Sequence, residues 1–189
     1  MAKKSTIFAT TLTSTRLAMA VCFAIVLPRS EGGNWATWVA MLFLALIEFS
    51  DIFDGVLARR WEQVSEFGKM FDPYADSVSR LIVYWSLARA GRCLYILPLV
   101  MAVRDITVSY VRVWGAMQGR DVSARFTGKA KAIVQGLGAG VLTTGPLYWG
   151  GASRSIIVVT SIVVLAMTAI SMADYVLAAR ESAQPKPQD

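Results

Sequence analysis

Long apolar runs separated by short polar connections make up most of the chain. Each run approaches the roughly 20 residues that a helix needs to cross the hydrocarbon core of a bilayer. The pattern therefore predicts an all-α integral membrane protein, a bundle of six transmembrane helices in a single domain over residues 1–180, with a disordered tail over 181–189. The expected helices cover residues 9–28, 35–58, 71–90, 94–117, 132–149 and 153–178.

Composition agrees with a membrane class. The chain has 55% hydrophobic and only 17% charged residues, whereas soluble domains carry about 25% charged residues. A net charge of +6 is also typical of proteins that bind nucleic acid. Here the basic residues flank apolar runs, so we expect membrane lipids and phosphorylated substrates as partners and no nucleic acid.

The distribution of Lys and Arg between the connections predicts the orientation. With the N-terminus inside, eleven basic residues fall on the cytoplasmic side and four, Arg29, Arg89, Arg92 and Arg154, fall outside. Cytoplasmic loops carry the excess of basic residues in membrane proteins. We therefore expect a multi-pass protein of the bacterial inner membrane with both termini in the cytoplasm.

Four aspartates gather around the connection between the second and third apolar runs. Asp51 and Asp54 lie one helical turn apart, and so do Asp72 and Asp76, so each pair shares a helix face. Two facing helices would aim four carboxylates at one point. Oxygen donors without His or Cys suit a hard cation, so the sequence predicts that Mg²⁺ or Mn²⁺ binds here. Two such ions could share the four carboxylates. Charged helix ends at a membrane surface would explain the acidity but not the spacing.

The same helix stripe carries small residues and an arginine. Gly55 and Ala58 leave room for a ligand to approach the backbone, and Arg59 offers a planar fork for phosphate. Together with Gly68, these residues complete the pattern D-x-x-D-G-x-x-A-R-x8-G-x-x-x-D-x-x-x-D. With every fixed position present, the chain resembles the CDP-alcohol phosphatidyltransferases.

The resemblance implies an activity. Members of this family transfer the phosphatidyl group of CDP-diacylglycerol to a small polar alcohol and release CMP, usually as homodimers. By resemblance, Asp51, Asp54 and Asp72 hold the metals, and Asp76 completes the second metal site or acts as base. The other pattern residues contact the cytidine diphosphate group: Gly55, Ala58, Arg59 and Gly68.

Two further stretches resemble the bacterial phosphatidylglycerolphosphate synthases within the family. L-T-x-x-R ends at Arg16, which either snorkels to the headgroups or faces the site as a phosphate ligand. R-D-x-x-x-S-x-x-R ends at Arg112, and G-K-x-K contains Lys129 and Lys131. An anionic acceptor needs a cationic pocket, so we expect Arg112, Lys129 and Lys131 to bind glycerol 3-phosphate.

Alternatives remain at the level of the sequence. Inositol phosphate, serine or phosphatidylglycerol would serve the same reaction as acceptors. Outside the family, carboxylates within a helical bundle also suit a divalent-cation transporter, but such sites lie near the bilayer midplane. The four aspartates lie instead near the cytoplasmic edge.

Overall fold

The computed structural model describes residues 2–32, 34–61, 66–119, 126–149 and 153–183. Side chains are described over narrower ranges, which exclude residues 51–61 and 66–69. Within these ranges the fold is all-α, as expected, with six α-helices and one short 3-10 helix. The elements are α1 (Ala2–Val26), η1 (Leu27–Gly32), α2 (Asn34–Trp61), α3 (Glu66–Arg89), α4 (Ile96–Met117), α5 (Phe126–Tyr148) and α6 (Ser153–Ala183).

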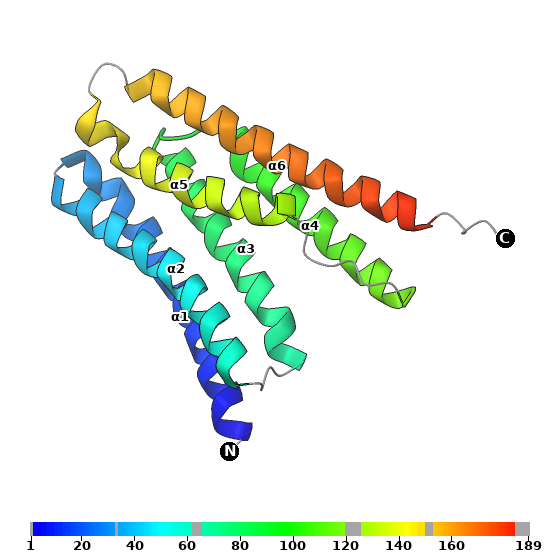
Figure 1. The fold of residues 1–189 in the computed structure, drawn as a ribbon. Helices are drawn as coiled ribbons and strands as arrows, with labels where there is room; N and C mark the ends of the chain where they lie inside the picture. The colour runs from blue at the N-terminus through cyan, green and yellow to red at the C-terminus, as the bar shows by residue number, and fades with distance from the viewer. Residues whose placement is uncertain (1, 33, 62–65, 120–125, 150–152, 184–189) are drawn as a thin grey trace.

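The helices form two groups, α1 to α3 and α4 to α6, and the groups contact each other where α2 meets α5 and where α3 meets α4 and α5. Helix α1 packs against α2 and α3, and α6 packs against α4 and α5. Figure 1 shows α1 and α2 side by side on one flank and α6 along the other, with α3 and α5 between them. The start of α1 lies toward the bottom of that view and the end of α6 toward its right.

Several helices are longer than their apolar runs. Helix α3 begins at Glu66 instead of residue 71, α5 begins at Phe126 instead of residue 132, and α6 continues to Ala183. The hydropathy pattern finds only the apolar part, whereas backbone hydrogen bonding continues through polar turns. Pro73 consequently lies inside α3 and not in its first turn.

The bundle has an apolar core, and it also buries several charged and hydroxyl side chains while many large apolar side chains are exposed. Arg16, Arg80 and Lys131 are buried, together with the hydroxyls of Ser161 and Thr168. Large apolar side chains are exposed along the helices, including Leu42, Phe49, Trp85, Leu99, Ile106, Leu137, Val159, Ile162 and Leu177. A protein folded in water buries such side chains and exposes the charged ones.

One helix of the described residues is long and apolar enough to cross a membrane. Among the described residues, the segment Arg154–Arg180 is long and apolar enough by length and composition, and a shorter apolar segment covers Trp35–Ser50. Helices α3 and α4 carry ionisable side chains that lower their hydropathy. The described residues thus contain six helices but one such span.

Candidate active site

Helix α3 presents Asp72 and Asp76 one turn apart, as the spacing predicts. Both side chains are partly exposed, and that of Asp76 retains 30% of its accessible surface. Asp76 lies between two arginines from different helices. This end of α3 is therefore a place where carboxylates and guanidinium groups meet at the edge of the bundle.

Arg16 of α1 faces this carboxylate. Its Nη1 lies 3.8 Å from Oδ1 of Asp76, and its side chain retains only 2% of its accessible surface. A snorkelling arginine would extend outward to the headgroups. The snorkelling alternative is thus wrong, and Arg16 lies inside the bundle beside Asp76.

Arg80 of α3 binds Asp76 and also contacts helices α2 and α5. Its Nε donates to Oδ1 of Asp76 at 3.0 Å, and its Nη1 and Nη2 donate to the two carboxylate oxygens of Glu48 on α2 at 3.0 and 3.3 Å. Nη1 also donates to the backbone carbonyl of Ala132 on α5 at 3.2 Å. Because a guanidinium is planar, these bonds fix the position of Asp76 relative to α2 and α5.

A second buried charge cluster joins α4, α5 and α6. Asp105 accepts from Nη1 of Arg104 at 2.8 Å and from Nζ of Lys131 at 3.1 Å. Arg104 also donates from Nη2 to the hydroxyl of Ser171 at 2.7 Å. Two cations and one carboxylate leave this cluster with a positive balance.

Tyr175 of α6 lies between this cluster and Arg112, one of the residues predicted to bind the acceptor alcohol. Its hydroxyl accepts from Nη2 of Arg112 at 2.8 Å. Of the predicted lysines, Lys129 is exposed near the start of α5, while Lys131 is buried against Asp105. The structure therefore brings Arg112 and Lys131 to one side of the bundle and leaves Lys129 at the surface. Ala132, whose carbonyl accepts from Arg80, directly follows Lys131 in α5 and so links the two clusters.

Half of the predicted metal site lies outside the described side chains. Asp51 and Asp54, with Gly55, Ala58 and Arg59, lie in the last turns of α2, and Gly68 lies in the first turn of α3, where no side chain is described. Among the side chains that are described, no group of three or more metal-binding residues occurs. Asp72 and Asp76 supply oxygen donors only, which fits a hard divalent ion.

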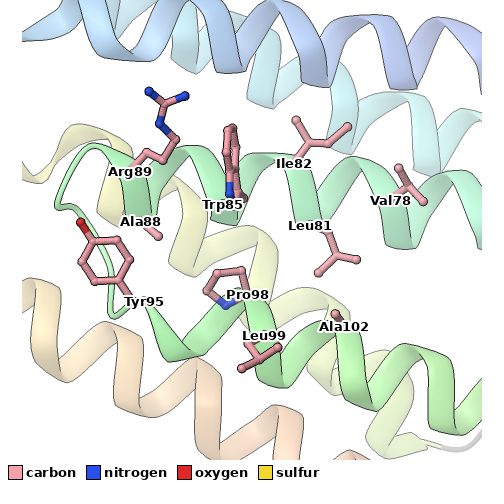
Figure 2. A pocket seen from close by; sticks show the side chains of 10 residues that line it. All are labelled: Val78, Leu81, Ile82, Trp85, Ala88, Arg89, Tyr95, Pro98, Leu99 and Ala102. Atoms are coloured by element: carbon pink, nitrogen blue, oxygen red, sulfur yellow. The ribbon is translucent and has the colours of Figure 1, made fainter.

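An apolar groove lies elsewhere on the bundle. A groove of about 570 Å³ runs along α3 and α4, and Figure 2 shows its lining. Arg89 is the charged residue among those that line it: Val78, Leu81, Ile82, Trp85, Ala88, Arg89, Tyr95, Pro98, Leu99 and Ala102. Without carboxylates or a cluster of cations, the groove is unsuited to a diphosphate.

Comparison with known proteins identifies the family. Residues 6–171 match the CDP-alcohol phosphatidyltransferase family. The chain belongs to this family, a membrane-associated one whose members use divalent cations, and the resemblance drawn from the aspartate pattern is confirmed.

Three similar proteins from different bacteria carry the same name. The chain is 39% identical to the CDP-diacylglycerol–glycerol-3-phosphate 3-phosphatidyltransferase of Mycoplasma genitalium, over 51% of this chain and 41% of that protein. Proteins of the same name from Salmonella typhimurium and Shigella flexneri are 34% and 31% identical, over 61% and 78% of this chain. The matches span 65% of the Salmonella protein and 81% of the Shigella protein.

Sequence reasoning undervalued Glu48 and passed over Tyr175. Glu48 lies one helical turn before Asp51 but outside the aspartate pattern, and it pairs with Arg80. Tyr175 belongs to no motif. Its partners Arg104 and Arg112 lie far away along the chain, so no local spacing indicated the contact.

Proposed function

We propose that the protein transfers the phosphatidyl group of CDP-diacylglycerol to glycerol 3-phosphate, giving phosphatidylglycerol phosphate and CMP in phospholipid biosynthesis. The observation that carries the proposal is the pairing of Asp76 with Arg16 and Arg80 at the end of α3, beside a cationic cluster on α4 to α6. The names of the relatives support the choice of acceptor.

The apolar exterior supports a multi-pass placement in the membrane. Several charged and hydroxyl side chains that are buried in the bundle bind one another, as Arg104 binds Asp105 and Ser171, whereas the exposed apolar side chains suit hydrocarbon. Together with the bias of basic residues, this favours an active site at the cytoplasmic face. We also expect a homodimer, as in other members of the family.

The metal site of the proposal combines α2 and α3. Asp51, Asp54, Asp72 and Asp76 would hold one or two Mg²⁺ or Mn²⁺ ions. A bound divalent ion supplies positive charge that neutralises the diphosphate and the departing CMP. Gly55, Ala58, Arg59 and Gly68 would contact the cytidine diphosphate, as the resemblance implies.

The chain's own side chains perform the remaining tasks. The acceptor hydroxyl attacks the phosphorus that carries diacylglycerol, and the bond from this phosphorus to the bridging oxygen breaks as CMP leaves. Arg80 and Arg16 flank Asp76, which would take the proton of the acceptor hydroxyl or complete the second metal site. Arg16 would also offer its charge to a phosphate.

The acceptor pocket would centre on Arg112. Among the described residues, no carboxylate forms an ion pair with Arg112, whereas Lys131 is paired with Asp105. Lys129, exposed at the start of α5, would attract the anionic acceptor toward this pocket.

The test is an acceptor panel. Purified protein in lipid nanodiscs receives CDP-diacylglycerol and Mg²⁺ with glycerol 3-phosphate, inositol phosphate, serine or phosphatidylglycerol, and CMP release is measured. We expect the highest kcat/KM with glycerol 3-phosphate. A higher value with another alcohol would overturn the acceptor while retaining the family reaction.

A further inference from the structure

Tyr175 occupies a place where three helices meet. Its side chain is 1% exposed, and its ring lies near two guanidinium groups from α4. The central carbons of Arg104 and Arg112 lie 5.4 and 5.3 Å from the ring centroid, within the range of cation-π attraction. One aromatic ring from α6 thus contacts two cations that lie on one face of α4.

The two arginines differ in what else they bind. Arg104 donates to Asp105 and Ser171, so its terminal nitrogens are used within the bundle. Arg112 donates from Nη2 to the Tyr175 hydroxyl and is partly exposed. In the part of the chain that the structure describes, no carboxylate neutralises its charge. Arg112 therefore retains the capacity to bind an anion.

Helix α5 approaches the tyrosine closely. A Cβ added at Gly128 would lie 3.2 Å from the Tyr175 hydroxyl and 3.7 Å from Nη2 of Arg104. Such a contact is tighter than ordinary van der Waals packing, so a larger residue would displace the tyrosine. Glycine at the head of G-K-x-K thus allows α5 to contact the Tyr175 ring.

We propose that Tyr175 is a positioning residue that holds the Arg112 guanidinium for the phosphate group of the acceptor. The ligand class is a small alcohol that carries a phosphomonoester. The inference rests on the proposed function, because it assigns Arg112 to the acceptor. Holding the guanidinium in one orientation before binding reduces the entropy lost when the phosphate docks.

The experiment compares two tyrosines. Tyr175→Phe removes the hydroxyl and keeps the ring, and Tyr175→Leu removes both contacts. Tyr84→Phe is the matched control, because Tyr84 is also 1% exposed and its hydroxyl donates to the carbonyl of Gln135 at 2.6 Å. Full-length protein is assayed for the KM of each substrate and for kcat/KM with glycerol 3-phosphate relative to glycerol. These quantities do not depend on the amount of folded enzyme.

We expect Tyr175→Phe to raise the KM for glycerol 3-phosphate about tenfold, as for the loss of a hydrogen bond to a charged group, with the KM for CDP-diacylglycerol unchanged. Tyr175→Leu should have a larger effect, and selectivity over glycerol should fall in parallel. Tyr84→Phe should leave both KM values unchanged. Gly128→Ala displaces Tyr175 without altering its side chain and should also raise the KM for glycerol 3-phosphate. This variant provides the test if the Tyr175 variants do not fold.

Two failures are distinguishable. If Arg112→Ala leaves the KM for glycerol 3-phosphate unchanged, the acceptor assignment itself is wrong. If Arg112→Ala raises that KM while Tyr175→Phe and Gly128→Ala do not, or raise both KM values equally, the positioning role is overturned.

Discussion

Arg80 binds two carboxylates and one carbonyl from three different helices. Asp76 is therefore positioned by a guanidinium that is itself fixed by Glu48 and by the backbone of Ala132. The same carboxylate lies close to Arg16. At the scale of single residues, the orientation of Asp76 depends on side chains outside the aspartate pattern.

Removing the Arg80 guanidinium should therefore lower kcat. Arg80→Met keeps the aliphatic stem but leaves Asp76 and Glu48 without their shared partner. We expect kcat for CMP release to fall about 100-fold, the size of effect that a small misplacement of a reacting group produces. The KM for glycerol 3-phosphate should change little.

Glu48→Gln provides the graded comparison. The amide retains an oxygen that can accept from Arg80, so we expect a decrease in kcat smaller than that of Arg80→Met. Wild-type kcat in Arg80→Met would contradict a role of Arg80 in orienting Asp76.

The glycines of α5 differ in what surrounds them. A Cβ at Gly138 would lie 2.6 Å from Cγ2 of Val164 and 3.0 Å from the Tyr84 hydroxyl. At Gly140, nothing among the described residues lies within 4 Å of such a Cβ. Gly138 thus serves close packing of α5 against α3 and α6, and Gly140 does not.

The two glycines give a matched pair for stability. We expect Gly138→Ala to destabilise the bundle by about 1–3 kcal/mol, because Val164 is stiff and Tyr84 is hydrogen-bonded. Gly140→Ala should stabilise it by about 0.5–1 kcal/mol through helix propensity. Thermal unfolding in one detergent measures both; equal shifts in Tm would contradict the packing difference.

At the scale of elements, prediction succeeded where the signal was local. Apolar runs predicted six helices, and the spacing of Asp72 and Asp76 predicted a shared helix face. The polar first turns of α3 and α5 carry no hydropathy signal and were missed. Contacts of Glu48 with Arg80 and of Arg112 with Tyr175 join residues 32 and 63 positions apart, so only packing of the helices reveals them.

For the whole molecule, the exposed apolar side chains and the bias of basic residues predict a fixed orientation in the bilayer. Arg154 lies exposed at the start of α6 and Met117 lies exposed at the end of α4. The bias of basic residues assigns these positions to opposite sides of the membrane. A membrane-impermeant maleimide can therefore distinguish the two sides.

Labelling in intact cells tests this orientation. Cys22 is replaced by Ser to remove a background thiol, whereas burial raises the pKa of the Cys93 thiol to about 12 and keeps it unreactive. Arg154→Cys should react in intact cells, and Met117→Cys only after permeabilisation. The reverse pattern would place the site outside the cytoplasm.

The claim that carboxylates of α2 and α3 form the catalytic centre is tested most directly by Asp72→Asn. CMP release from CDP-diacylglycerol is measured at saturating Mg²⁺ and glycerol 3-phosphate, with Asp189→Asn as a control for the same change of charge at the last residue of the chain. We predict that Asp72→Asn abolishes CMP release while Asp189→Asn retains it. Unchanged turnover in Asp72→Asn would contradict the account.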